Sequence, residues 1–85
     1  MILMINVPEY TPKGSIRLEW EDNFTIETHL TQNDVLIKAN APGLISLARH
    51  LLSMAQPEVP KYYHLHFDDL NSLEPGSCEL IIEKI

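Results

Sequence analysis

Alternation of apolar and polar residues predicts two β-strands that pair as a hairpin in the first third of the chain. In residues 15–20 and again in 24–30, about every second residue is apolar, which is the period of a strand with one buried face. A three-residue loop sets Trp20 opposite Phe24 and keeps the apolar side chains on one face, whereas a two-residue loop crosses the faces. Asn23 is then expected to take the left-handed conformation that such a loop requires.

Two further segments extend the predicted sheet. Residues 2–7 form a short apolar run that ends at Pro8, and residues 35–40 follow a polar turn. Pairing Leu30 with Val35 keeps the core face of the second hairpin strand continuous with the first. We therefore expect four strands before the middle of the chain.

The segment after Asn40 has the periodicity of an amphipathic helix. Pro42 suits its first turn, and Pro57 ends it. On a wheel of about 100° per residue, one half is apolar and the other half is polar. The apolar half consists of Leu44, Ile45, Leu47, Ala48, Leu51, Leu52, Met54 and Ala55. The polar half consists of Ser46, Arg49, His50, Ser53 and Gln56. We expect the apolar half to pack on the sheet and the polar half to face water.

Residues 61–68 and 77–84 form the last predicted hairpin. Its core face pairs Leu65 with Leu80 and Phe67 with Cys78. The resulting order of elements is β-β-β-β-α-β-β, which defines an α+β fold in one domain over residues 1–85. We expect a single mixed or antiparallel sheet of five to six strands, with one amphipathic helix packed on one face.

The length, charge and cysteine content narrow the classes of function. Eighty-five residues are too few for the barrels and doubly wound sheets of most metabolic enzymes. Twelve acidic residues against six basic ones give a net charge of −6, which repels nucleic acid and attracts a basic protein partner. The single cysteine, Cys78, cannot form an internal disulfide, and no apolar run reaches the length of about 20 residues that a membrane span needs. We expect a cytoplasmic bacterial protein that binds neither nucleic acid nor membrane.

Three motifs in the second half of the chain carry a resemblance to a known family. They are Gly43-Leu44 at the start of the Leu- and Ala-rich helix, His64-Leu65-His66-Phe67-Asp68 on a strand, and Gly76-Ser77 before a closing apolar strand. In this order and spacing they resemble the immunity protein 32 family of bacterial polymorphic toxin systems, over about residues 40–84. The resemblance implies a small α+β protein that binds and neutralises a cognate toxin made by the same cell.

His64, His66 and Asp68 alternate along one predicted strand, so their side chains project to one side, about 6.5–7 Å apart. Imidazoles in this pattern suit zinc, iron or manganese, and the string approaches the His-x-His-x-Asp-His motif of metallo-β-lactamase-type hydrolases. It departs from that motif at Asp69, where those enzymes have histidine. Three interpretations stay open: a metal site, a recognition face for a protein, or an ordinary polar sheet face on which His66 pairs with Glu79.

We predict an immunity protein whose partner is a cognate protein toxin, and a homodimer is the other association that we consider. The alternative is a small metal-binding protein or metalloenzyme that uses His64, His66 and Asp68. No nucleophile–base pair or carboxylate pair stands out in the sequence, so we expect no enzymatic activity and no cofactor. The partner is expected on or beside the last hairpin, where aromatic, apolar and polar side chains form a mixed patch. This patch consists of Tyr62, His64, His66, Asp68 and Ile81.

Overall fold

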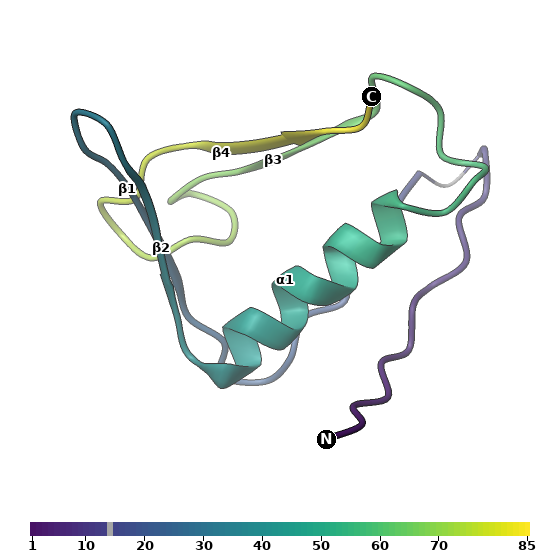
Figure 1. Cartoon of the computed structure of the whole chain (residues 1–85), viewed down its shortest axis with the longest axis horizontal. Helices are drawn as coiled ribbons and strands as arrows, with labels where there is room; N and C mark the ends of the chain where they lie inside the picture. Colours follow the sequence, from purple (N-terminus) through teal and green to yellow (C-terminus); the bar gives the residue numbers. More distant parts are fainter. Residues whose placement is uncertain (14) are drawn as a thin grey trace.

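The computed structural model describes residues 1–13 and 15–85 (Figure 1). Its elements, in chain order, are β1 (Ile26–Leu30), β2 (Val35–Ala39), α1 (Ala41–Met54), β3 (His64–Phe67) and β4 (Leu80–Glu83). The predicted α+β class is confirmed. The predicted single sheet of five to six strands is wrong, because the strands within the described residues form two separate two-stranded sheets, β1–β2 and β3–β4.

The β1–β2 hairpin has the predicted antiparallel register. Leu30 lies opposite Val35, and Thr28 lies opposite Ile37. The turn between the strands is closed by the backbone N–H of Thr31, which donates to the carbonyl of Asp34 at 2.9 Å. Short loops fix register strongly, because a slip of one residue would turn every side chain to the opposite face.

The predicted strands at residues 2–7 and 15–20 are wrong. Within the described residues, the segment before β1 has only an isolated bridge, between Thr11 and Ser15. Its backbone is bound instead by side chains from α1 and from the residues just after it: for example, Gln56 Oε1 accepts from the N–H of Tyr10 at 3.0 Å. A strand ladder is one way to satisfy backbone polar groups, and here side chains take over part of that role.

Helix α1 begins after Asn40, as the sequence predicts, and ends at Met54, two residues short of the predicted end at Gln56. Asn40 is its N-cap, and the Oδ1 atom of Asn40 accepts from the N–H of Gly43 at 2.8 Å and from the N–H of Thr25 at 2.9 Å. Pro42 lies in the first turn, where its missing N–H costs nothing. The Asn40 amide therefore joins the start of the helix to the segment that leads into β1.

The predicted orientation of α1 is wrong, because the polar half of the wheel is largely buried. Ser46, Arg49, His50 and Ser53 are all buried. By contrast, Leu44, Leu51 and Leu52 are 55%, 46% and 49% exposed. Two of these buried side chains bind the backbone of the N-terminal segment: Ser46 Oγ accepts from the N–H of Glu21 at 2.8 Å, and Arg49 donates to the Asn6 carbonyl at 3.0 Å. Part of the polar half of the helix thus supplies hydrogen bonds to this extended segment.

The β3–β4 hairpin forms with a register two residues away from the predicted one. Leu65 lies opposite Ile82 instead of Leu80, and Phe67 lies opposite Leu80 instead of Cys78. A shift of two residues keeps every side chain on its predicted face, because the side-chain period of a strand is two.

The loop between β3 and β4 connects the two sheets through single hydrogen bonds. The N–H of Glu74 donates to the Ile26 carbonyl at 2.9 Å, and the N–H of Cys78 donates to the Thr28 carbonyl at 3.0 Å. These bonds bind the edge of β1 that β2 leaves open. They are made by a loop and not by a strand, so the sheets stay separate.

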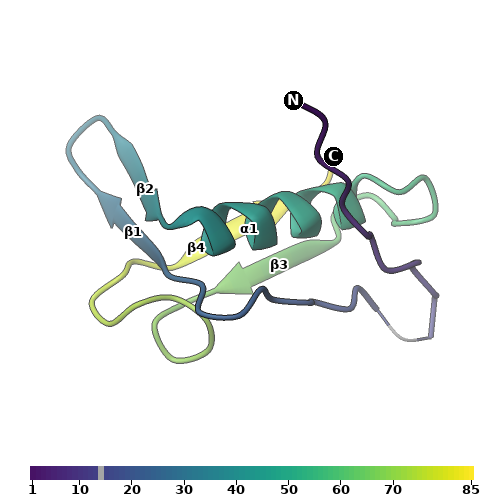
Figure 2. The same ribbon diagram turned by 90° about the horizontal axis from the view of Figure 1, so that it is seen from below.

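The core lies between α1, the two hairpins and the segment before β1 (Figure 2). Its buried apolar members are Ile16, Ile26, Met54, Val59, Leu65, Phe67 and Leu73. Trp20 stacks on Phe24 with ring centroids 4.4 Å apart, although residues 15–20 form no strand, and Asn23 between them has the predicted positive φ of 61°. None of the helices among the described residues has the length and apolarity that crossing a membrane demands.

Candidate functional face

The outer face of the β3–β4 hairpin carries two histidine–glutamate pairs. His66 Nδ1 lies 3.3 Å from Glu79 Oε2, and His64 Nδ1 lies 3.9 Å from Glu83 Oε1. The two imidazole rings are themselves adjacent, with centroids 4.8 Å apart. The predicted pair of His66 and Glu79 is confirmed, although the register makes it a diagonal contact; long side chains reach diagonal neighbours in a sheet.

We call this surface the hairpin face; its members are Tyr62, His64, His66, Glu79, Ile81 and Glu83. The four charged or ionisable side chains of the two pairs are each about half exposed. Water and salt therefore screen the pairs, which contribute little to folding stability. Ile81, directly opposite His66 in the ladder, is 51% exposed. The face thus combines an apolar centre with polar groups whose hydrogen bonds to water can be replaced by hydrogen bonds to a partner.

Tyr62 lies two residues before β3, in a strained backbone conformation. Its φ is 71°, in the left-handed region that a bulky residue rarely adopts. The conformation is fixed by the N–H of Tyr62, which donates to the carbonyl of Lys84 at 2.7 Å. His64 Nδ1 also lies 3.0 Å from the Tyr62 carbonyl oxygen. The Tyr62 residue is 69% exposed, so its aromatic side chain is offered to solvent from a backbone fixed by hydrogen bonds.

Asp68 does not join the histidines. Its Oδ1 atom accepts from the N–H of Leu70 at 2.9 Å and from the N–H of Asn71 at 3.1 Å, so the carboxylate closes the turn that follows β3. Within residues 1–13 and 15–85, no three His, Cys, Asp or Glu side chains are grouped so that they could hold a metal ion. The geometry therefore gives the metal hypothesis no support.

A buried histidine in α1 escaped the sequence analysis. His50 is 0% exposed, and its ring lies between Trp20, at a centroid distance of 4.4 Å, and Phe67, at 5.8 Å. Neither ring nitrogen has a hydrogen-bond partner among the described residues. Burial, and secondarily the charge of Arg49, lowers the pKa of His50 from 6.5 to about 4. Its position in the polar half of the wheel gave no sign that it would be buried.

Cys78 is half-buried and contacts Thr28, whose Oγ1 atom lies 3.5 Å from the thiol. Its predicted place on the core face opposite Phe67 is wrong, because the shifted register leaves it in the loop before β4. Thr28 also donates its hydroxyl to the carbonyl of Cys78. The cysteine therefore helps to connect this loop to β1.

The fold and the hairpin face together define a small α+β protein whose distinctive surface is an exposed β-hairpin bearing histidine, glutamate and aromatic side chains. The model of one protein family, immunity protein 32, matches residues 34–85. The chain belongs to the immunity protein 32 family. The matched region contains β2, α1, β3 and β4 and therefore includes the whole hairpin face. Neither the curated proteins nor the solved structures give a significant match to the chain.

Proposed function

We propose that this protein binds a cognate toxin in the cytoplasm of the cell that makes both, and neutralises it by occupying its surface. Membership of the immunity protein 32 family, through the match over residues 34–85, is the observation that carries the proposal. Immunity by this route requires binding and no catalysis. We treat the whole chain, residues 1–85, as the binding unit.

The hairpin face is the surface that we propose for the toxin. Exposed tyrosine side chains are typical anchors of protein interfaces, and a polar rim is typical of their borders. Tyr62 supplies the anchor, Ile81 adds exposed apolar surface, and the two histidine–glutamate pairs supply the polar groups. Asp68 follows β3 directly and caps the turn after the strand, so it marks the border of the hairpin face.

Charge supports a basic partner. The chain has a net charge of −6, and Glu79 and Glu83 add two exposed carboxylates to the hairpin face. A negative surface speeds the encounter with a positive one and disfavours wrong partners of like charge. We therefore propose that the toxin surface covered by this face is basic.

Survival of cells that produce the toxin tests the function. The cognate toxin is expressed alone, with this protein, and with a variant that carries Tyr62→Ala and His64→Ala. The wild-type protein is expected to restore growth, and the double variant is expected to restore it much less. Absence of protection by the wild-type protein would contradict the proposed function, whereas full protection by a folded double variant would move the interface off the hairpin face.

A matched control separates loss of contact from loss of fold. His29 is also a solvent-accessible strand histidine paired with a glutamate, since its Nε2 atom lies 3.1 Å from Glu27 Oε1, but it lies on β1. His29→Ala therefore removes the same kind of side chain and the same kind of pair away from the hairpin face. We expect the His29→Ala variant to protect as well as the wild-type protein.

A further inference from the structure

The two histidines of the hairpin face use the same ring nitrogen for their hydrogen bonds within the chain. His64 Nδ1 lies 3.0 Å from the carbonyl oxygen of Tyr62, and His66 Nδ1 lies 3.3 Å from Glu79 Oε2. A carbonyl oxygen or an ionised carboxylate only accepts, so Nδ1 carries the proton in both rings. In a neutral imidazole the other nitrogen, Nε2, then holds a lone pair. Both half-exposed rings therefore keep Nε2 as a hydrogen-bond acceptor for a partner.

The carboxylates of the hairpin face are acceptors as well. The side chains of Glu79 and Glu83 are each 50% exposed, and an ionised carboxylate accepts through both oxygens and donates nothing. Ile81 has no polar side-chain atom. Of the side chains on this face, the hydroxyl of Tyr62 is the one group that donates when both histidines are neutral. The face is therefore complementary to a partner surface that is rich in N–H donors.

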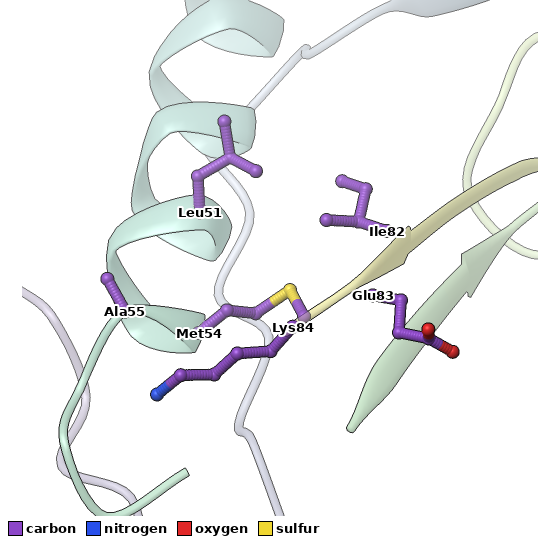
Figure 3. A pocket seen from close by; sticks show the side chains of 6 residues that line it. All are labelled: Leu51, Met54, Ala55, Ile82, Glu83 and Lys84. Atoms are coloured by element: carbon purple, nitrogen blue, oxygen red, sulfur yellow. The ribbon is translucent and has the colours of Figure 1, made fainter. Parts of the chain in front are cut away.

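The lysines near the hairpin face do not neutralise its carboxylates. Lys84 extends along the groove that Leu51 lines from α1, and its Nζ donates to the carbonyl of Gln56 at 2.7 Å, while the Glu83 carboxylate points away from the helix (Figure 3). Lys61 precedes Tyr62 in the chain. Among the described residues, the ion pairs of the two glutamates are with histidine and not with lysine.

The segments beside His66 add no free cation to the face. The segment before β1 and His66 line a small pocket together, and in that segment Arg17 pairs with Glu19 at 3.4 Å. On the other side, the carboxylate of Asp68 accepts from two backbone N–H groups of the turn after β3. The charges that face the two imidazoles are therefore negative, which favours a partner that brings positive donors.

We propose, building on the proposed binding of a toxin, that neutral His64 and His66 accept hydrogen bonds at Nε2 from lysine or arginine side chains of the toxin, so that the complex weakens when these histidines take up protons. Protonation turns Nε2 from an acceptor into a donor and sets positive charge against a positive partner. The imidazolium also neutralises the glutamate with which it pairs. Histidine is the side chain whose charge changes between about pH 5 and 8, so the face binds best at neutral or alkaline pH.

The affinity of the purified chain for the cognate toxin, measured by isothermal titration calorimetry from about pH 8 to about pH 5.5, tests the proposal. The wild-type protein is expected to lose affinity by about tenfold or more across this range. His50 stays in place in every variant, so its own response to pH is common to all of them. Circular dichroism at each pH checks that the chain is folded.

Two double variants separate the roles of the two ring nitrogens. A glutamine amide reaches as far as Nε2 and offers an acceptor that does not titrate, whereas an asparagine amide reaches only as far as Nδ1. The His64→Gln, His66→Gln variant is expected to bind at about pH 8 and to keep its affinity in mild acid. The His64→Asn, His66→Asn variant is expected to bind about tenfold more weakly or worse at every pH.

His29→Gln is the matched control, because His29 also pairs with a glutamate but lies on β1. This variant is expected to keep the affinity and the pH profile of the wild-type protein. Wild-type affinity that stays constant or rises in acid would overturn the inference and leave the proposed function intact, whereas absence of binding at every pH would contradict the function itself. A folded glutamine variant that weakens in acid as steeply as the wild-type protein, or binds no better than the asparagine variant, would also overturn the inference.

Discussion

The ring of His50 is an ionisable group that occupies an aromatic site, between Trp20 and Phe67. An imidazole without hydrogen-bond partners is tolerated in such a place only in its neutral form, because the charged form would lose its hydration. This explains the direction of its pKa change, from 6.5 to about 4. The residue therefore links folding to proton binding.

We expect the free energy of unfolding to fall as the pH is lowered from 6.5 toward 4. In this window the unfolded chain protonates His50 while the folded chain does not, so the unfolded state binds more protons and gains stability. Above pH 6.5 the residue is neutral in both states and has no such effect. Since one pKa unit is worth about 1.36 kcal/mol, the loss approaches about 3 kcal/mol below pH 4.

Urea unfolding of the wild-type protein and of His50→Leu, at pH values from neutrality down to about 4, measures this term. The variant lacks the titrating ring, so the difference in unfolding free energy between the two proteins is expected to change with pH by about 3 kcal/mol in favour of the variant. Other groups titrate equally in both proteins and cancel. A difference that does not change with pH would show that His50 is accessible to protons in the folded chain.

Gly43 is a second residue whose role follows from its immediate contacts. A glycine inside a helix usually costs about 1 kcal/mol relative to alanine. Here a Cβ atom would overlap the backbone carbonyl oxygen of Thr25 and press on the side chains of Asn40 and Ile26. We therefore expect Gly43→Ala to destabilise the protein by about 2 kcal/mol or more, because a backbone carbonyl cannot easily move away.

Gly76→Ala is the comparison for Gly43→Ala. Nothing lies within 4 Å of a Cβ atom at position 76, but its φ of +85° is unfavourable for alanine. That substitution is expected to cost about 1 kcal/mol, from backbone strain alone. Midpoints of urea unfolding measure the loss of stability in both variants. A Gly43→Ala protein as stable as the wild-type protein would contradict the close packing of α1 on the segment before β1.

At the scale of elements, the orientation of α1 depends on hydrogen bonds that reach far along the chain. The Arg49 guanidinium donates to the carbonyls of Asn6 and Glu19, at 3.0 and 3.2 Å, and contacts the carboxylate of Glu21 at 2.9 Å. One side chain of the helix thus binds three positions of the extended segment. Charged hydrogen bonds of this kind are stronger than neutral ones and leave costly unpaired groups when they are broken.

We expect Arg49→Ala to lower the free energy of unfolding by about 2–4 kcal/mol, from the loss of these bonds in a largely buried place. Arg17→Ala is the matched control, because the Arg17 side chain is 76% exposed and contacts Glu19 at 3.4 Å. The control is expected to stay within about 0.5 kcal/mol of the wild-type protein. Equal effects in urea unfolding would mean that the polar side of α1 faces water after all.

The elements that the sequence predicts correctly are those that local chemistry determines. The short loop and the alternation of β1 fix the β1–β2 register, and an asparagine cap followed by proline fixes the start of α1. The predicted β3–β4 register was wrong by two residues. The 12-residue loop between Phe67 and Leu80 is too long to fix the register, and alternation alone does not distinguish two registers that differ by two residues.

The orientation of α1 could not be predicted from the periodicity of the helix. The hydrophobic pattern identifies an apolar side, but not what covers it. The polar side is buried because its side chains form hydrogen bonds with the backbone of a segment far away in the sequence. Arg49 binds the backbone of Asn6, 43 residues earlier, and Ser46 binds the backbone of Glu21, 25 residues earlier. The pairing of His66 with Glu79 followed from the strand pattern, whereas the positive φ of Tyr62 left no sequence signal.

At the scale of the whole molecule, two surfaces of different chemistry belong to different elements. The hairpin face is acidic and mixed, on and beside β3 and β4, whereas the outward side of α1 and the groove beside it are largely apolar. Interfaces between proteins that also exist apart are about as polar as the rest of the surface, with aromatic anchors and a polar rim. We therefore expect the toxin to bind the hairpin face.

The mass of the complex between this protein and its cognate toxin, measured by native mass spectrometry, tests this account most directly. The expected assembly contains both the chain and the toxin, whereas the Tyr62→Ala, His64→Ala double variant is expected to fold without joining the toxin. A folded double variant that binds the toxin as strongly as the wild-type protein would contradict the placement of the interface on the hairpin face. Failure of the wild-type protein to form any complex would contradict the proposed function itself.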